Sequence, residues 1–378
     1  MKKKIVFFVE SLHCGGAERS LLSLLNNLDS SKYDIYLLVL NKGGEFEEFL
    51  PSFVIYNKVN IKFTLLGRLK FKLFKKLLPK RHNAQFFWKA FNSSIPQYSE
   101  SFDIAVGWGQ GFATYFTAEK IKAKRKLAWV NTDYAKAGYK SQYDQEIYSK
   151  YDKVVGISDF VKNSMEVFIP TEKVVTIPNI IDVDDVEKRA NKPISENLKK
   201  NYKMLIVSVG RLAKPKAFDL AIKAANILKD KGVDFIWYII GEGSEREYLQ
   251  SLIDQYELKQ HFTLLGFRSN PYPYINQADL YVQTSIFEGL GRTLIEAAML
   301  HKPIVTTDFE TAYDLVDQDK TGMITPKAPE AIAAAIFKIY QNEDLYQEMK
   351  KNQASSTRIS AAHVVEQFDD MVEELLKE

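Results

Sequence analysis

The chain has 378 residues, 46% of them hydrophobic and 26% charged, which is typical of a globular protein with room for two or three domains. Its formal net charge of +3 is too small to indicate a nucleic-acid partner, and its single cysteine, Cys14, excludes an intramolecular disulfide. The apolar run after the first lysines ends at Glu10, which is too short for a signal peptide, and no apolar run is long enough to span a bilayer. We therefore expect a cytoplasmic protein.

The first half of the chain alternates between predicted strands and helices. A buried strand at 5–9 leads through Gly15-Gly16 into a helical repeat of leucines. Further strands are predicted at 35–40, 104–108, 126–130 and 153–158. This alternation predicts a doubly wound α/β domain over residues 1–182. The paired glycines let the backbone approach a ligand closely, although a tight turn would explain them equally well.

A basic segment at about 58–91 interrupts this domain. No acidic residue occurs between Glu48 and Glu100, and from Leu66 to Leu78 apolar residues recur at helical spacing with cations between them. The pattern is typical of a basic amphipathic helix on an anionic membrane surface, with these cations on the membrane or acceptor side: Arg68, Lys70, Lys72, Lys75 and Lys76. One alternative is a helix whose apolar face packs on the core while its lysines lie in water. The other is a nucleic-acid patch, which the low net charge disfavours.

The second half of the chain restarts the alternation. The polar stretch at 183–202, which contains Pro193, predicts a linker between domains. A second α/β domain is expected at 203–360, with strands at 204–209, 235–240, 263–267, 278–283, 303–306 and 322–325. A helix is predicted at the C-terminus, 361–378.

Residues suited to a diphosphate and to hydroxyl groups lie at the ends of these strands. Arg211 and Lys216 follow the first strand, Gly241 the second, Gly266 ends the third, and Glu288 follows the fourth. Because ligands bind beyond the carboxyl ends of the strands in an open parallel sheet, we expect these residues on one rim. Cations suit a diphosphate, and carboxylates suit the hydroxyl groups of a ribose or a pyranose. The rim therefore predicts a nucleotide-sugar site.

The turn after the fourth strand carries two carboxylates. Glu288 and Glu296 flank the stretch Gly289-Leu290-Gly291-Arg292-Thr293, where a strand gives way to a helix. Unpaired N–H groups and the positive end of the helix dipole suit an anion there. The alternative is an ordinary surface turn with two solvated glutamates.

These motifs make the chain resemble the retaining glycosyltransferases of the GT-B fold, glycosyltransferase family four. The resemblance covers most of the chain and is carried by Gly15-Gly16-Ala17-Glu18, Ser158-Asp159, Pro178-Asn179, Gly210-Arg211-Leu212 with Lys216, Gly241-Glu242-Gly243 and the paired glutamates. It implies two Rossmann-like domains facing across a deep cleft, the first for the acceptor and the second for the nucleotide sugar. It also implies a final helix that crosses back to the first domain.

The resemblance implies a role for each residue of the rim. As catalytic residues, Arg211 and Lys216 would grip the donor diphosphate and neutralise the charge that develops on it, and Glu288 would hold hydroxyls of the transferred sugar. Glu296 would accept from the ribose hydroxyls. The other donor-binding residues would be Gly15, Gly16, Asn131, Gly241, Gly266, Phe267, Arg268, Gly289, Leu290, Gly291, Arg292 and Thr293. Of these, Gly266, Phe267 and Arg268 would line the base pocket.

The resemblance also implies a mechanism in which the departing phosphate deprotonates the incoming hydroxyl on the same face of the sugar. No residue need then act as a general base, and neither a metal ion nor another cofactor is expected. Asp182-Val183-Asp184 spells the metal-binding motif of the other major glycosyltransferase fold, and we interpret it as a solvated loop. Four residues depart from the family pattern. Arg292 and Thr293 replace smaller or apolar residues often seen in the glutamate motif, and Arg292 is either a further phosphate contact or a surface charge. Asn131 stands where many members carry histidine, and Ala217 replaces a glycine, which is compatible if a helix has already begun there.

We therefore predict a bacterial enzyme, cytoplasmic and peripheral on the inner face of the cell membrane. It would move a sugar from a nucleotide-diphosphate sugar such as a UDP-sugar to a lipid-linked or cell-envelope polysaccharide acceptor, with no nucleic-acid partner. One alternative is a nucleotide-sugar epimerase or hydrolase on the same scaffold. The other is a non-catalytic nucleotide-sugar-binding protein, for which Asn131 is the one hint.

Overall fold

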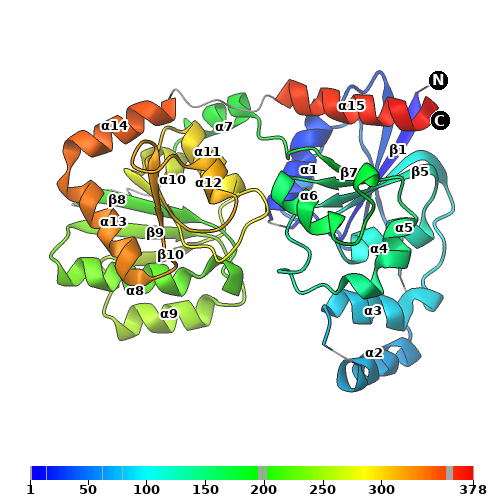
Figure 1. Ribbon diagram of the computed structural model, residues 1–378, viewed down its shortest axis with the longest axis horizontal. Coiled ribbons are helices and arrows are strands. Elements are labelled where there is room, and N and C mark those ends of the chain that lie inside the picture. The colour runs from blue at the N-terminus through cyan, green and yellow to red at the C-terminus, as the bar shows by residue number, and fades with distance from the viewer. Residues whose placement is uncertain are drawn as a thin grey trace. The chain divides into compact units, whose positions relative to one another are not determined.

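The chain folds into two compact units, each built around one parallel sheet (Figure 1). The computed structural model describes residues 2–13, 15–61, 63–78, 80–194, 198, 202–354 and 361–377, so Cys14 lies outside the described residues. Unit 1 comprises Met1–Ile180 together with Ile359–Glu378, and unit 2 comprises Ile181–Arg358.

Among the described residues, the sheet of unit 1 has seven strands in the order β3-β2-β1-β4-β5-β6-β7, and all neighbouring strands are parallel. The strands are β1 (Lys3–Val9), β2 (Tyr33–Val39), β3 (Ile55–Lys58), β4 (Ser101–Trp108), β5 (Lys122–Val130), β6 (Lys153–Gly156) and β7 (Val174–Thr176). The apolar run of β1 lies at the centre of the sheet, where Ile5 to Phe8 are fully buried. The strand order reverses between β1 and β4, which is the switch point where doubly wound sheets bind ligands.

Helices cover both faces of this sheet. The helices of unit 1 are α1 (Gly16–Asn27), α2 (Leu65–Leu77), α3 (Asn83–Phe91), α4 (Phe112–Lys120), α5 (Gln145–Ser149), α6 (Asp159–Glu166) and α15 (Ala361–Lys377), with short 3-10 turns at Glu47–Phe49, Asn92–Ser94, Ser141–Tyr143 and Thr171–Lys173. Of these, α2 packs on α3 and not on the sheet (Figure 1). The last helix, α15, packs on unit 1, because Phe368 stacks on Phe7 with ring centroids 6.0 Å apart and Lys32 Nζ lies 2.7 Å from Asp369 Oδ2.

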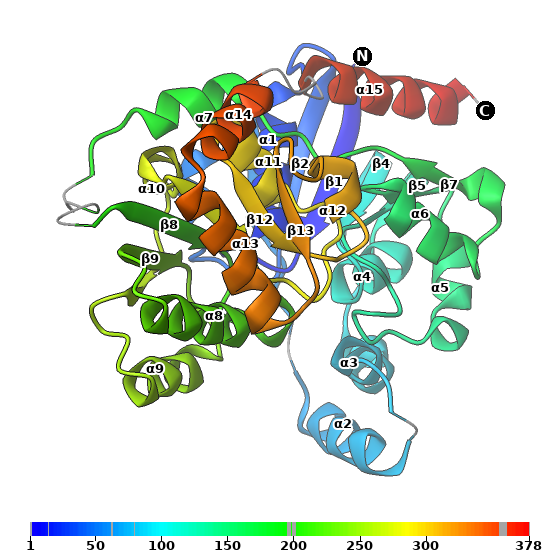
Figure 2. The same cartoon turned by 60° about the vertical axis from the view of Figure 1, so that its left-hand side comes forward.

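The sheet of unit 2 has six strands among the described residues, in the order β10-β9-β8-β11-β12-β13, again with parallel neighbours. They are β8 (Met204–Val209), β9 (Phe235–Ile240), β10 (Phe262–Gly266), β11 (Leu280–Gln283), β12 (Ile304–Thr307) and β13 (Gly322–Thr325). Figure 2 shows the sheet between two layers of helices. One layer contains α8 (Phe218–Asp230), α9 (Arg246–Gln255) and α13 (Pro329–Gln341), and the other α7 (Val183–Ala190), α10 (Tyr272–Gln277), α11 (Arg292–Met299) and α12 (Ala312–Leu315). Helix α14 (Glu343–Ala354) follows α13, and a 3-10 turn, Lys214–Lys216, precedes α8.

The predicted linker at 183–202 is wrong over its first part, because residues 183–190 form α7 and belong to unit 2. Val186 and Ala190 are buried in the core of unit 2, while Glu187 and Lys188 between them are exposed. The apolar periodicity of α7 is weak in the sequence, because its buried positions are two small apolar residues among many charged ones.

Asp182 is the N-cap of α7, because its Oδ1 accepts a hydrogen bond of 3.0 Å from the backbone N–H of Asp185. This carboxylate is therefore a structural cap and not part of a solvated loop, whereas the side chain of Asp184 lies outside the described part of the structure. No group of three or more His, Cys, Asp and Glu side chains within the described residues could hold a metal ion. None of the helices in that part of the chain is both long and apolar enough to cross a membrane.

Candidate functional site

The loops that follow β8 and β9 are in close backbone contact at the carboxyl edge of the sheet of unit 2. A methyl group on Gly241, whose φ is +149°, would lie 1.9 Å from the carbonyl oxygen of Gly210. A methyl group on Gly243 would lie 2.3 Å from the carbonyl oxygen of Leu212. The backbone N–H of Leu212 in turn donates to the carbonyl oxygen of Glu242 over 2.9 Å. The glycines predicted to approach a ligand therefore also allow one loop to pack on the other.

The two predicted cations of this edge lie in different surroundings. Lys216 ends the 3-10 turn that precedes α8, and its Nζ lies 2.5 Å from Glu288 Oε1. The Arg211 side chain is exposed and makes no hydrogen bond or ion pair with any residue that the structure describes. Lys216 is thus held by a carboxylate, while Arg211 is available to an anion in solution.

Glu288 is held through one of its two oxygens. Oε1 accepts from Lys216 Nζ, from Ser285 Oγ over 2.6 Å and from Gln283 Nε2 over 2.8 Å. The amide oxygen of Gln283 accepts from Thr293 Oγ1 over 2.8 Å. Oε2 makes no hydrogen bond within the described part of the chain and remains available as an acceptor.

Glu296 lies deep in unit 2, with 1% of its surface exposed. Its Oε1 accepts from Arg292 Nε over 2.9 Å and from the hydroxyl group of Tyr272 over 3.0 Å. Neither glutamate of the motif is therefore a solvated residue of a surface turn. Arg292, which the sequence leaves as either a phosphate contact or a surface charge, forms an ion pair within its own helix and its side chain is only 10% exposed.

The turn between these glutamates needs a glycine at its end. Gly291 has a φ of +70° and is the N-cap of α11, which begins at Arg292. Gly289 and Leu290 lead into it, and the backbone N–H groups of Leu294 and Ile295 both bond to the carbonyl oxygen of Gly291.

The predicted base-pocket residues lie at the end of β10. Gly266 has a φ of +79°, and its N-terminal neighbours pair with β9. Arg268 Nε donates to the hydroxyl group of Tyr274 over 2.9 Å, and Arg268 Nη1 donates to the carbonyl oxygen of Phe267 over 3.0 Å. These bonds hold the guanidinium group against α10.

Asn131 lies at the carboxyl end of β5 in unit 1 and is oriented by a chain of hydrogen bonds. The indole N–H of Trp129 donates to Asn179 Oδ1 over 3.2 Å, and Asn179 Nδ2 donates to Asn131 Oδ1 over 3.1 Å. Because an indole nitrogen can only donate, both amide groups have a defined orientation. Asn131 Nδ2 is buried and has no hydrogen-bond partner among the described residues, so the donor is available to a ligand oxygen.

Other residues lie at the carboxyl edge of the sheet of unit 1. Gly15 caps α1 in an extended conformation, and a methyl group on Gly16 would meet no atom within 4 Å, so steric room does not require a glycine there. Glu10 follows β1, and desolvation together with repulsion from Glu18 raises the pKa of its carboxyl group.

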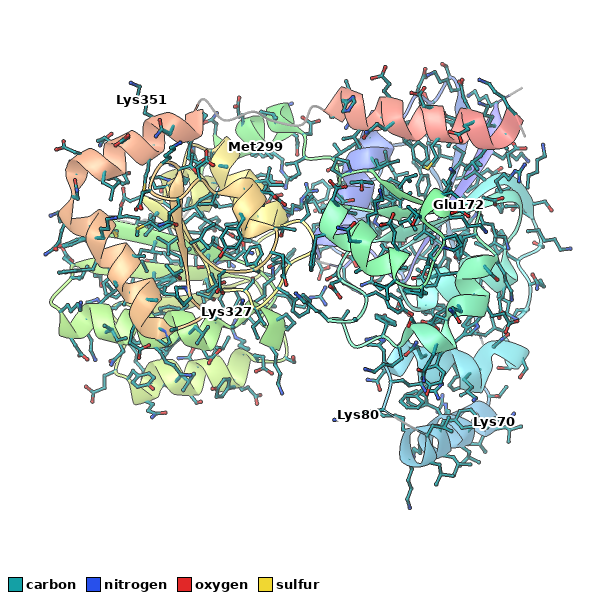
Figure 3. The ribbon with its side chains drawn as sticks, viewed as in Figure 1. Lys70, Lys80, Glu172, Met299, Lys327 and Lys351 are labelled. Carbon is teal, nitrogen blue, oxygen red and sulfur yellow. The ribbon has the colours of Figure 1, made fainter. Side chains whose placement is uncertain are left out.

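Helix α2, in the basic segment of unit 1, has two apolar faces. One face packs on α3, where a methyl group on Gly67 would lie 2.4 Å from the ring of Phe91, and Phe71 contacts Phe87 edge to face. The other face leaves five leucine side chains between 51% and 75% exposed: Leu65, Leu66, Leu69, Leu73 and Leu77. Figure 3 shows α2 at the outer end of unit 1, with Lys70 and Lys80 labelled. The alternative in which the apolar face of this helix packs on the core and only its lysines lie in water therefore does not describe α2.

Sequence reasoning missed three residues of the site in unit 2: Gln283, Ser285 and Tyr272. Gln283 and Ser285 are almost fully buried polar residues at the end of an apolar strand. Polar residues three and five positions before a glutamate, at the end of a buried strand, are a signal that could have identified these two. Tyr272 gives no such signal, because its contact with Glu296 joins two separate helices.

Two family models match nearly the whole chain. The model described as Glycosyltransferase Family 4 matches residues 14–185, and the model described as Glycosyl transferases group 1 matches residues 188–356. The chain belongs to the family-four glycosyltransferases. It is therefore a transferase, with two Rossmann-like domains of the GT-B fold and a nucleotide sugar as its donor.

Named relatives and solved structures agree with this assignment. The glycosyltransferase is 28% identical to N-acetylgalactosamine-N,N'-diacetylbacillosaminyl-diphospho-undecaprenol 4-alpha-N-acetylgalactosaminyltransferase of Campylobacter jejuni, over 99% of this chain and 100% of the relative. It is 28% identical to the putative colanic acid biosynthesis glycosyltransferase WcaL of Escherichia coli, over 50% of this chain and 47% of WcaL. The fold matches Anabaena HepE in complex with UDP and glucose with a TM-score of 0.73, at 18% identity, over 98% of this chain and 99% of HepE.

Ala217, which replaces the usual glycine after the lysine, has a left-handed backbone with φ and ψ of 45°. The helix α8 begins only at Phe218, so the condition under which a methyl group is compatible with position 217 is not met. A left-handed conformation costs an L-residue about 1–2 kcal/mol, whereas glycine adopts it without that cost.

We therefore expect Ala217→Gly to stabilise the glycosyltransferase by about 0.5–1 kcal/mol, since the relief of strain exceeds the added entropy of the unfolded chain. The midpoint of thermal unfolding should rise. The matched control is Gly232→Ala, where φ is +71° and no atom lies within 4 Å of the new methyl group, so the midpoint should fall. A fall for Ala217→Gly would contradict the strain at this position.

Proposed function

We propose that this glycosyltransferase moves a sugar from a UDP-sugar, with retention of configuration, to a lipid-linked or cell-envelope polysaccharide acceptor at the inner face of a bacterial membrane. The observation that carries the proposal is the Lys216–Glu288 pair, together with the exposed Arg211, at the carboxyl edge of the sheet. The name of the Campylobacter jejuni relative specifies an undecaprenol-diphosphate-linked acceptor, and the HepE structure contains UDP; both support the choice of substrates.

In this proposal the two cations bind the donor diphosphate. The exposed guanidinium group of Arg211 can form two parallel hydrogen bonds to phosphate oxygens, and the ammonium group of Lys216 adds a point charge. Glu288 Oε2 accepts from hydroxyl groups of the transferred sugar, and Glu296 accepts from the ribose. The positive charges stabilise the diphosphate as the bond to the sugar breaks.

The proposed transfer step needs no protein base. The bond between the anomeric carbon and the phosphate oxygen breaks, and a bond between that carbon and the acceptor oxygen forms on the same face. The proton of the acceptor hydroxyl passes to the phosphate oxygen of the departing UDP. Arg211 and Lys216 provide the positive charge at this phosphate, so we propose that no metal ion takes part.

We expect Lys216→Ala to lower kcat/KM for the UDP-sugar by about a hundredfold, the usual effect of removing a group that stabilises charge in the transition state. Release of UDP should be measured with UDP-glucose, UDP-galactose, UDP-N-acetylglucosamine and UDP-N-acetylgalactosamine, in the presence of EDTA. Lys214→Ala is the matched control, because Lys214 is an exposed lysine on the same turn. Equal activity of the two variants, or loss of wild-type activity in EDTA, would contradict the proposal.

The membrane part of the proposal rests on the exposed face of α2. Four of the exposed leucines recur at every fourth residue: Leu65, Leu69, Leu73 and Leu77. Residues at this spacing lie on one face of an α-helix, so these side chains form a single stripe. Lys72 and Lys76 border this stripe, and no acidic residue occurs in the helix. Such an apolar stripe beside cations is suited to insertion at the interface of an anionic bilayer, which attracts each nearby cation by about 1 kcal/mol.

We expect the triple variant Lys72→Glu, Lys75→Glu and Lys76→Glu to lose most of its co-sedimentation with vesicles of phosphatidylglycerol and phosphatidylcholine. The change reverses the attraction to the anionic surface. The matched control carries Lys188→Glu, Lys320→Glu and Lys351→Glu, three exposed lysines of unit 2 with the same change in net charge. If both triple variants bind equally well, α2 is not the membrane contact.

A further inference from the structure

The carboxylate of Glu288 is anchored by two neutral groups as well as by Lys216. Ser285 Oγ donates to Oε1 over 2.6 Å and Gln283 Nε2 donates to the same oxygen over 2.8 Å. Ser285 is fully buried and Gln283 is 3% exposed, so both donors lie beneath the surface of the site. Hydrogen bonds to an ionised acceptor are stronger than bonds between neutral groups, and they restrict where the carboxylate can lie.

The amide of Gln283 can serve Glu288 in only one orientation. A carboxylate accepts and does not donate, so the NH2 group of Gln283 must face Glu288 and its oxygen must face away. That oxygen accepts from Thr293 Oγ1 over 2.8 Å. Thr293 lies in the first turn of α11, so a continuous chain of hydrogen bonds links the start of this helix to Glu288.

The neutral anchors matter because Lys216 has two competing partners. In the structure its ammonium group lies 2.5 Å from Glu288 Oε1, yet the proposed function directs it to the donor diphosphate. When a diphosphate binds Lys216, the ion pair with Glu288 weakens. Gln283 and Ser285 make their bonds to Glu288 independently of Lys216, so the carboxylate keeps its position and Oε2 stays directed to its ligand.

We propose that Gln283, Ser285 and Thr293 are positioning residues that hold Glu288 for the hydroxyl groups of the donor sugar after Lys216 has engaged the diphosphate. The inference rests on the proposed function and extends it to residues that act through Glu288, so that Thr293, which the resemblance places among the donor-binding residues, has an indirect role. It also accounts for Thr293, which departs from the smaller or apolar residues often found at this position of the motif. By donating to the amide oxygen of Gln283, the hydroxyl group of Thr293 holds this amide in the orientation that Glu288 requires.

The test compares Thr293→Val, which removes the hydroxyl group at constant shape, with Thr293→Ser, which keeps it. With the best donor of the UDP-sugar panel, Thr293→Val should lower kcat/KM by about threefold to tenfold, the effect of one lost hydrogen bond. Thr293→Ser should restore most of the wild-type value. The inhibition constant of UDP, which carries no sugar, should stay unchanged in both variants.

Two further measurements separate positioning from general damage. Thr306→Val is the matched control, because Thr306 is a fully buried threonine of the neighbouring strand β12 whose hydroxyl group lies outside this chain of bonds. It should leave kcat/KM unchanged. In a Glu288→Ala background, Thr293→Val should have no further effect, since its action passes through Glu288.

An additive effect of Thr293→Val in the Glu288→Ala background would overturn the positioning role. So would a parallel rise in the inhibition constant of UDP, or failure of Thr293→Ser to restore activity. Failure of the proposed function shows elsewhere: wild-type protein would then release no UDP from any donor in the panel, and both proposals would be overturned.

Discussion

The ion pair between Lys216 and Glu288 depends on the order of strands in the sheet of unit 2. The two residues are 72 positions apart in the chain, yet their charged atoms lie 2.5 Å from each other. They meet because β8 and β11 are parallel neighbours, so the loops after both strands leave the same edge of the sheet. Two further bonds join these loops: Ile286 N–H donates to the carbonyl oxygen of Pro215, and Thr284 Oγ1 donates to that of Lys216.

The same edge contains backbone and packing features that would be unfavourable elsewhere. Ala217 adopts a left-handed conformation directly after the lysine, and Gly241 allows a contact that no side chain could permit. Unfavourable backbone conformations persist where many surrounding hydrogen bonds and contacts hold the chain in place. They commonly occur at functional sites. Here Gly241 lets the loops after β8 and β9 lie close together, and the loop after β8 carries the cations that are proposed to bind the diphosphate.

Helix α2 shows a different use of apolar surface. Most amphipathic helices bury one apolar face and expose a polar one. In α2 the face toward α3 is aromatic and half-buried, whereas the opposite stripe of leucines is exposed and bordered by lysines. The helix thus carries more apolar surface than unit 1 can cover, and an anionic membrane is the partner that we propose for the remainder.

The sequence by itself determined the alternation of strands and helices, the glycine turns, the positions of Arg211, Lys216 and the paired glutamates, and the basic helix. Each of these features is local: buried parallel strands are continuous apolar runs, and a helix has its own period. It also supported the family, which the two family models confirm. The sequence did not reveal α7, because two small buried residues carry its period among many charges.

Only the tertiary structure decided which side chains meet. The burial of Glu296 against Tyr272, the pairing of Glu288 with Lys216, and the attachment of α15 to unit 1 all join separate elements of the chain. The conformation of Ala217 likewise follows from the way in which its loop is tied to neighbouring strands. Such contacts depend on strand order and helix packing, and no spacing within one segment encodes them.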